Sequence, residues 1–457
     1  MQKTNNGKPN ILFIMSDQHR YDYFGAAGAD FMNTPNLDRL AQRGVRFSNC
    51  CTNSPLCTPA RLSLATGLLP HRVGLRNPDF LPLSTPTYYQ HVRDHGYRVG
   101  CVGKLDLAKA DGYNGRYGDR PCAYSWGFTH PEECEGKMHA GRSATPLGPY
   151  TWYLENKGLL QAFHEDYQER EKKGWIKGAS HDSVLPTEDF EDVYIGRRAA
   201  EWLRNVPDDF PWHYFVSFVG PHDPFDPPTE YADLYRDADV PAPIPPNDQD
   251  KPDWIDGKKQ GCEAEEIRTA RRQYCASTQA IDEQIGAMLD ALEERGMLEN
   301  TYIIYSSDHG EMLGDHGLFT KSVPYEASMR VPLLISGPGI EKERTSEALV
   351  ELMDLNPTIS DLAGLPRQRE MDAQSLLPVL EGQTDTHRSG CVSALTNFRC
   401  IRTAEHKFVE SYNDKTELYD LRNDPDEQVN VIDDHPEAAG QLRRQLNERW
   451  NQGAWNR

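Results

Sequence analysis

Residues 54–67 read Ser54-Pro55-Leu56-Cys57-Thr58-Pro59-Ala60-Arg61-Leu62-Ser63-Leu64-Ala65-Thr66-Gly67. Pro59 presets a helical φ and is typical of the first turn of a helix, which places Cys57 at or just before a helix N-terminus. Free backbone N–H groups and the helix dipole favour an anion there, and the planar fork of Arg61 can bind two oxygens of a tetrahedral oxyanion. The stretch indicates a nucleophile aimed at an anionic ester. A buried cysteine ahead of an ordinary helix is an equally open interpretation of these residues alone.

The order Cys57-x-Pro59-x-Arg61, followed by Thr66-Gly67, resembles the signature of the type I sulfatases. The resemblance implies that a formylglycine-generating enzyme oxidises Cys57 to formylglycine. One hydroxyl of the hydrated aldehyde would then attack sulfur, and the second would let the sulfated intermediate collapse and release sulfate. Ala60 in place of the commoner Ser, and Ala65 in place of a larger apolar residue, are mild departures.

The composition limits the partners of the protein. The chain has 457 residues, 38% of them hydrophobic and 26% charged, an ordinary globular balance that predicts a large domain with a lesser one. A net charge of −21 argues against a nucleic-acid or acidic-membrane partner, so an anionic substrate requires a local cationic pocket. No apolar run is long enough to span a bilayer. The first nine residues lack the apolar centre of a signal peptide, which predicts a cytoplasmic protein, or a periplasmic or secreted one whose leader has been removed.

The cysteine pattern predicts neither a disulfide scaffold nor structural zinc. Ten cysteines are spread over the chain without a Cys-x-x-Cys pair, and most are expected to be free and buried.

Four apolar runs each end in polar residues. They cover residues 10–15, 97–103, 214–219 and 301–307, and they are followed by Asp17 and Gln18, by Lys104 and Asp106, by His222, and by Asp308 and His309. Such runs are typical of buried parallel strands, whose carboxyl ends form the ligand-binding edge of an open α/β sheet. Asp17 is therefore a candidate metal ligand, to which Gln18 could add a carbonyl oxygen. The alternative is that Asp17 only caps a following helix.

The segment Gly103-Lys104-Leu105-Asp106 both matches and departs from the sulfatase pattern. The family commonly has Gly-Lys-x-His there, and both the Lys and the His contact the sulfate. Lys104 matches, whereas Asp106 replaces the His. A carboxylate repels an anion unless it pairs with Lys104 or another cation, so Asp106 is predicted to orient a lysine or to recognise a substrate hydroxyl.

Two further segments resemble the family. The phrase from Ser307 to Lys321 implies that Asp308 and His309 bind metal, that Lys321 contacts the sulfate and the nucleophile, and that Asp315 and His316 support the loop. In Pro221-His222-Asp223-Pro224, the resemblance implies that His222 protonates the leaving oxygen, a role that suits a histidine held by prolines at a strand end.

The resemblance also implies a cofactor. A divalent cation, usually Ca²⁺ in this family, would be held by Asp17, Gln18, Asp308, His309 and the group formed at Cys57, and oxygen-rich ligands suit such a hard ion. The cation would act with Arg61, Lys104 and Lys321 to neutralise the sulfate and the charge that develops on it.

The matches extend over nearly the whole chain and imply the alkaline-phosphatase-like α/β sandwich. This fold has a large, mostly parallel sheet flanked by helices, expected in a catalytic domain of residues 1–384, and a small antiparallel C-terminal subdomain of residues 385–457. Helices are expected at 34–41 with a stop at Gly44, at 188–204 behind a Thr187 cap, at 263–295 and near 435–450. Residues 107–186 form an insertion without clean periodicity. Its aromatic residues could stack on sugars or pack a core of their own: Tyr113, Tyr117, Trp126, Tyr150, Trp152 and Tyr153.

The predicted activity is hydrolysis of a sulfate ester on a carbohydrate. A phosphonate monoester or phosphodiester hydrolase shares the framework. Lys104 argues against this alternative, and the absence of His at position 106 leaves it open. A catalytically silent, sulfated-glycan-binding protein is the third alternative, disfavoured because every expected metal ligand is present.

Overall fold

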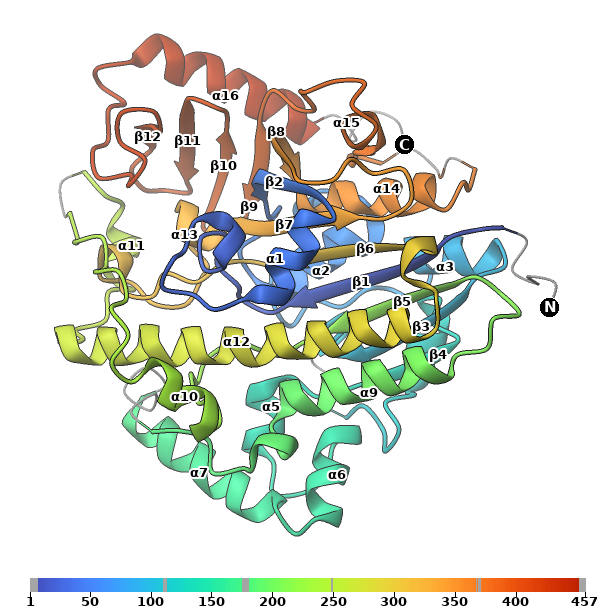
Figure 1. The fold of residues 1–457 in the computed structure, drawn as a ribbon. Coiled ribbons are helices and arrows are strands. Elements are labelled where there is room, and N and C mark those ends of the chain that lie inside the picture. The colour runs from blue at the N-terminus through green and yellow to red at the C-terminus, as the bar shows by residue number, and fades with distance from the viewer. Residues whose placement is uncertain are drawn as a thin grey trace.

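The computed structural model describes residues 7–109, 113–174, 181–247, 250–366, 368 and 371–451. A large sheet lies between two layers of helices, and a smaller sheet stands beside it (Figure 1). The strand order of the large sheet is β4-β3-β5-β1-β6-β7-β2-β8. All neighbouring strands are parallel except β7, which runs antiparallel to β6 and β2. The predicted α/β fold with a mostly parallel sheet is confirmed. The strands are β1 (Asn10–Ser16), β2 (Gly44–Cys51), β3 (Arg98–Gly103), β4 (His130–Glu133), β5 (Trp212–Ser217), β6 (Thr301–Ser307), β7 (Arg330–Ser336) and β8 (Arg344–Glu351).

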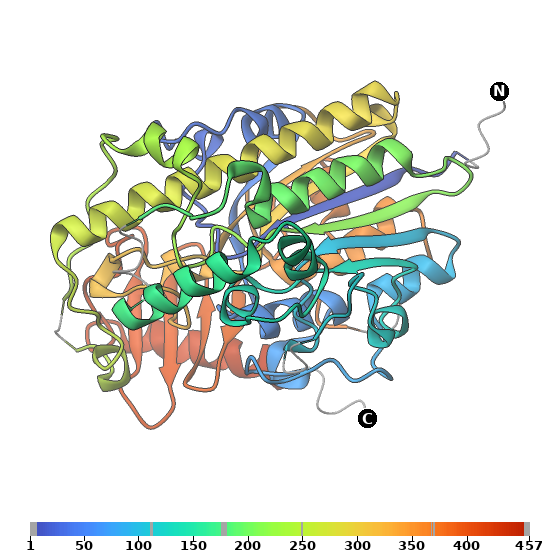
Figure 2. The same cartoon turned by 90° about the horizontal axis from the view of Figure 1, so that it is seen from below.

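The central strands are apolar throughout because both faces of the sheet are covered. In β1, Ile11 and Phe13 point into the core beneath α2 (Cys57–Thr66), α3 (Tyr88–Asp94) and α14 (Leu355–Leu362). Leu12 and Ile14 point into the opposite core, beneath α1 (Pro35–Gln42), α9 (Glu191–Asn205) and α12 (Ala264–Glu294). Figure 2 shows α9 and α12 running side by side along that face. No helix in the described part of the chain is long and apolar enough to cross a membrane.

The C-terminal region forms the predicted small antiparallel sheet, in the order β12-β11-β10-β9. Its strands are β9 (Cys391–Ala394), β10 (Phe398–Arg402), β11 (His406–Ser411) and β12 (Glu417–Asp420). Helix α16 (Pro436–Asn451) packs on β10 and β11, close to the predicted 435–450. The sheet joins the rest of the molecule at β9, where Ala394 N donates to Asn53 O at 3.0 Å.

The insertion at 107–186 has more regular structure than its sequence predicts. It supplies strand β4, which extends the large sheet beside β3. Its described residues also form four helices: α4 (Pro121–Ser125), α5 (Lys137–Arg142), α6 (Pro149–Asn156) and α7 (Leu160–Lys173). Trp126 and Tyr150 are buried in the cores and cannot stack on a sugar, whereas Tyr113 and Tyr117 are exposed. Residues 110–112 and 175–180 of the insertion, like residues 1–6 of the N-terminal segment, lie outside the described part of the chain.

Two predicted helix ends were wrong. Helix α9 begins at Glu191 after an extended Phe190, because Thr187 belongs to a separate 3₁₀ turn, Thr187–Asp189. Helix α1 ends at Gln42, and Gly44 is the first residue of β2 rather than a helix stop. A Cβ at position 44 would lie 2.1 Å from Ile335 O, so this glycine permits the close approach of β7.

Candidate active site

The four predicted strand ends meet at one edge of the sheet. Strands β3, β5, β1 and β6 are consecutive in the sheet and parallel. Their carboxyl ends are followed by Lys104, His222, Asp17 and Asp308 respectively. The strand order therefore brings together residues that are up to 291 positions apart, counted from Asp17 to Asp308.

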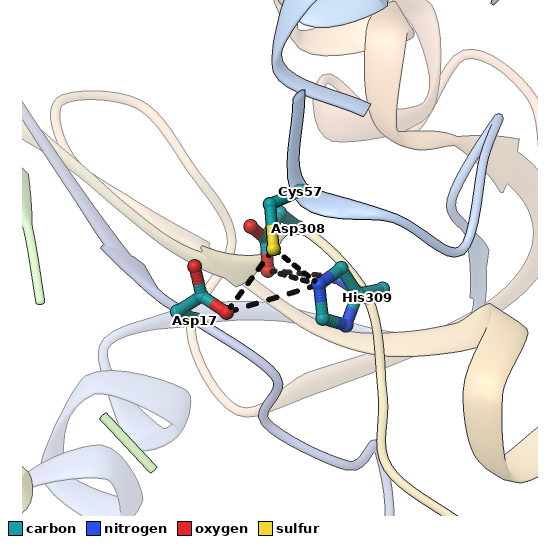
Figure 3. A group of neighbouring side chains, drawn as sticks. All are labelled: Asp17, Cys57, Asp308 and His309. Atoms are coloured by element: carbon teal, nitrogen blue, oxygen red, sulfur yellow. Dashed lines mark hydrogen bonds and ion pairs between the residues drawn. The ribbon is translucent and has the colours of Figure 1, made fainter. Parts of the chain in front are cut away.

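Four buried side chains converge on one point at this edge: Asp17, Cys57, Asp308 and His309 (Figure 3). One ligand atom from each lies within 4.8 Å of the others. The Cys57 Sγ atom is 3.2 Å from His309 Nε2 and 3.7 Å from Asp17 Oδ1. His309 Nε2 is in turn 3.6 Å from Asp308 Oδ1. The donor types and their convergence fit a divalent cation.

The charges of the cluster also fit a cation. Burial and the neighbouring Asp17 raise the pKa of Asp308, since two carboxylates in one dry site repel each other. The His309 ring nitrogen Nδ1 faces Gly310 O at 3.0 Å, so Nδ1 carries the proton and Nε2 presents a lone pair to the cluster. A divalent ion would relieve the repulsion and use that lone pair.

Gln18 lies beside the cluster with its side chain in a hydrogen-bonded network. Its Oε1 accepts from Lys321, and its Nε2 donates to Glu311 and, at 3.2 Å, to Asp223 Oδ1. Its φ of 72° lies in the left-handed region, which costs a non-glycine residue about 1–3 kcal/mol. The tightly held amide is adjacent to the cluster, and its role as a metal ligand stays a prediction.

Cys57 is the first residue of α2, as the position of Pro59 predicts. The preceding Leu56 is extended, and the whole of α2 is buried. Burial and Asp17 disfavour the thiolate, but Lys104 and Lys321 outweigh them and hold the pKa of Cys57 well below its usual range. The thiol therefore faces a cationic, anion-attracting region.

Arg61 contacts protein groups with each of its nitrogens. Its Nε donates to Asp308 Oδ2 at 2.8 Å, and one terminal nitrogen donates to Asp17 Oδ2 at 3.2 Å. The other donates to Lys104 O at 2.6 Å and to Ser217 Oγ at 2.8 Å. Arg61 is only 2% exposed, so this geometry favours fixing the two carboxylates over touching a sulfate, the contact that the sequence predicts.

Lys104, Lys321 and His222 surround the cluster. Lys104 Nζ donates to Asp17 Oδ2, and Lys321 Nζ lies 2.5 Å from His222 Nε2. His222 Nδ1 faces Asp223 O at 2.7 Å, which leaves Nε2 directed toward Lys321 and the centre of the site. The two ammonium groups and the imidazole are therefore placed around the atoms that an anionic ester would occupy.

Asp106 pairs with lysines, as its position in an anion site requires. One oxygen, Oδ2, lies 3.0 Å from Lys109 Nζ and 3.3 Å from Lys104 Nζ. Burial opposes ionisation, yet the two lysines hold the pKa of Asp106 well below its usual range. The first alternative from the sequence, that Asp106 orients a lysine, agrees with this geometry.

Several residues of the site carry no clear signal in the sequence. Glu311 accepts from Gln18, and burial raises its pKa to about 7. Asp223 lies within the recognised proline-histidine segment but shows its contact with Gln18 only in three dimensions. Lys137 comes from α5 and donates to the carbonyls of His222 and Pro224. The loop-supporting role of Asp315 fits its ion pairs with Arg20 and Arg271.

A small pocket opens beside Lys104 and His222. Its lining consists of Lys104, Lys109, Gly136, Lys137, Met138, His139 and His222. The pocket is rich in cationic side chains in a protein of net charge −21, as an anionic substrate requires. A larger cavity of about 340 Å³, beside Arg271 and Glu427, is lined in part by the predicted loop supports Asp315 and His316 but by none of the predicted catalytic or metal-binding residues.

Comparisons with known proteins agree with this geometry. The sequence profile of the sulfatase family matches residues 9–365, and that of the C-terminal region of N-sulphoglucosamine sulphohydrolase matches residues 314–454. A choline-sulfatase from Rhizobium meliloti is 32% identical over 452 residues, which cover 93% of this chain and 83% of the relative. An N-acetylglucosamine-6-O-sulfatase from Bacteroides thetaiotaomicron is 28% identical, with coverage of 94% and 84%.

A solved structure shares the fold as well. The phosphonate monoester hydrolase from Silicibacter pomeroyi superposes with a TM-score of 0.80 at 26% identity, covering 96% of this chain and 94% of that one. The sheet, the clustered site and the match of the sulfatase profile to most of the sequence together show that this chain belongs to the sulfatase family of sulfuric ester hydrolases.

Proposed function

We propose that this protein hydrolyses a sulfate ester of a carbohydrate, with a formylglycine formed from Cys57 as nucleophile and Ca²⁺ as the metal. One observation carries the proposal: Cys57 lies among three side chains that could bind a metal, close to Lys104, Lys321 and His222. The maturation partner is a formylglycine-generating enzyme. The carbohydrate is supported by the relative that acts on N-acetylglucosamine-6-O-sulfate, and by the polar, cationic pocket.

Asp17, Asp308 and His309, with Gln18 and the group at position 57, would hold the cation. When present, the metal supplies positive charge and the hydrated formylglycine supplies a nucleophilic oxygen. Arg61 fixes both carboxylates through its paired hydrogen bonds. These groups are buried and hydrogen-bonded before substrate arrives, which is the arrangement that electrostatic catalysis requires.

The remaining residues bind the ester and move its proton. Lys104 and Lys321 bind the sulfate oxygens, and the substrate replaces their present contacts with Asp17 and Gln18. With both ring nitrogens protonated and Lys321 drawn away to the sulfate, His222 gives the Nε2 proton to the departing alcohol, while its Nδ1–H stays bonded to Asp223 O. Asp106 keeps Lys104 in place and balances part of its charge.

The experiment is sulfate release from a panel of sulfated oligosaccharides and a small aryl sulfate, in the presence of Ca²⁺. The protein is produced with a formylglycine-generating enzyme, and mass spectrometry checks residue 57. We expect a strong preference for one oligosaccharide, and the Cys57→Ala variant should be folded but inactive. Activity retained by Cys57→Ala would refute the nucleophile, and better turnover of the aryl sulfate would refute the carbohydrate.

Phosphonate monoester hydrolysis is the second candidate. Asp106 stands where a sulfatase commonly has His, and the fold superposes on a phosphonate monoester hydrolase. A parallel assay of phosphonate release from a phosphonate monophenyl ester, and of phosphate monoester release from a phosphodiester, separates the two. Higher kcat/KM for the phosphonate than for every sulfate ester would establish the second candidate.

A further inference from the structure

The pocket beside the reaction centre contains two hydrogen-bond donors that the proposed chemistry does not use. Lys104 and His222 belong to the reaction centre. Lys137 is occupied by Asp226 and by the carbonyls of His222 and Pro224. Of the polar side chains in the lining, Lys109 and His139 remain.

His139 lies on α5, close to Lys104. The residue that precedes α5, Gly136, packs so tightly on Lys104 that a Cβ there would lie 3.3 Å from Lys104 Cε. Within the described part of the chain, neither ring nitrogen of His139 has a hydrogen-bond partner. Burial, with Lys109 and Lys104, lowers the pKa of His139 despite the opposing effect of Asp106. A neutral imidazole with an unused N–H thus faces the pocket.

Lys109 supplies a positive charge to the lining of the pocket. Its Nζ pairs with Asp106 Oδ2, the same oxygen that lies against Lys104. Two ammonium groups therefore share this carboxylate. Lys104 also pairs with Asp17, whereas Asp106 is the one carboxylate that pairs with Lys109 among the described residues. The Lys109 side chain is 21% exposed, against 5% for Lys104, so Lys109 is the one open to solvent.

We propose that Lys109 and His139 form an outer subsite for a second anionic group on the substrate, a carboxylate or a second sulfate next to the sulfate that is removed. Asp106 bridges the two lysines through Oδ2, with Lys104 facing the reacting sulfate and Lys109 facing the second group. The preferred substrates are then sulfated sugars with at least two negative charges. This inference rests on the proposed function for the identity of the reacting group.

Binding tests the subsite without depending on turnover. The Cys57→Ala protein, loaded with Ca²⁺, is titrated in a calorimeter with two pairs of ligands. The first pair is a sulfated, uronate-containing disaccharide and its carboxyl-reduced form. The second pair is disulfated and monosulfated N-acetylglucosamine. A hydrogen bond to a charged group is worth about 1.5–3 kcal/mol, so we expect the dianionic member of at least one pair to bind about 10- to 100-fold more tightly. Lys109→Met and His139→Ala should each reduce that ratio toward one.

Controls separate this subsite from general charge attraction. Lys109→Arg should keep the ratio, and so should Lys172→Met, which removes an exposed lysine of α7 that pairs with Glu169. Equal binding of both members of every pair, or a ratio unchanged in Lys109→Met and His139→Ala, would overturn the subsite. Failure of the wild-type protein that carries formylglycine at position 57 to release sulfate from any ester would instead overturn the proposed function, while the ratio of binding affinities still decides the subsite.

Discussion

The substitution Lys137→Met removes the ammonium group that anchors the His222 segment. The Lys137 side chain is 3% exposed, and its Nζ donates to His222 O at 3.1 Å and to Pro224 O at 2.7 Å. It also lies 2.6 Å from Asp226 Oδ1, a carboxylate that is itself 1% exposed. Met has a similar length and no charge, so the substitution leaves the buried Asp226 carboxylate and two backbone carbonyls without their ammonium partner.

Two effects of this substitution are expected, a loss of stability and a loss of kcat. Breaking a buried ion pair by removing one partner costs about 3–5 kcal/mol. With an unfolding entropy of about 2.1 cal/mol/K per residue, that loss corresponds to a fall in Tm of roughly 3–5 °C for a chain of this size. A displacement of about 1 Å at a catalytic group costs on the order of 100-fold, so we expect kcat to fall about 10- to 100-fold as His222 loses its anchor.

The double variant Lys137→Met/Asp226→Asn separates positioning from stability. Removing the stranded charge of Asp226 should restore most of the Tm in a thermal scan, but it cannot restore the bonds to the His222 and Pro224 carbonyls. The kcat for sulfate release should therefore stay low in both variants. The control Lys172→Met, on the exposed face of α7, should change neither quantity. A normal kcat in Lys137→Met, or recovery of kcat together with Tm in the double variant, would refute the positioning role.

Two further predictions concern a buried acid and the metal. Burial raises the pKa of Glu417 on β12 from 4.5 to about 7, so the folded protein holds this proton more tightly than the unfolded chain does. The stability that this proton contributes, about 3 kcal/mol, is therefore lost as pH rises from about 4.5 to 7. Glu417→Gln should raise the Tm at pH 8 but not at pH 4.5, and equal pH dependence of both proteins would contradict this. Chelation should lower the Tm and stop sulfate release because Asp17 and Asp308 then repel each other. Ca²⁺ at about 100 times its Kd should add roughly 2.7 kcal/mol to the free energy of unfolding. A Tm unaffected by chelation and by Ca²⁺ would refute the metal site.

The central strands were predictable because a strand buried on both faces needs a continuous apolar run. The runs at 10–15, 97–103 and 301–307 correspond to β1, β3 and β6 within one or two residues. Strands β2 and β8 were not predicted. Both carry polar residues on partly exposed positions, and their mutual pairing shifts register between Phe47 and Asn49. A mixed pattern with an irregular register gives neither a continuous apolar run nor a clean alternation.

The reaction centre was predictable for a related reason. Asp17, Lys104 and Asp308 directly follow strands, and Cys57 begins a helix. Local sequence therefore fixes their places within these elements, and the strand order of the sheet brings them together. The residues of α5 that line the pocket beside the reaction centre were not predictable. Lys137 and His139 belong to α5, 85 and 83 residues before His222, and no pattern in that polar segment shows which carbonyl or pocket they face.

The contrast between neighbours in the sequence and neighbours in the folded chain also explains Asp106. Judged by its neighbours in sequence, a carboxylate two residues after an anion-binding lysine opposes the expected chemistry. In the folded chain it lies between Lys104 and Lys109, and its φ of 53° costs a non-glycine residue about 1–3 kcal/mol. That strain is offset by two ion pairs in a nearly buried site, which places one ammonium group toward the metal cluster and one toward the pocket. The residue that departs most from the family pattern is therefore the one that divides the positive charge between the two proposed anion sites.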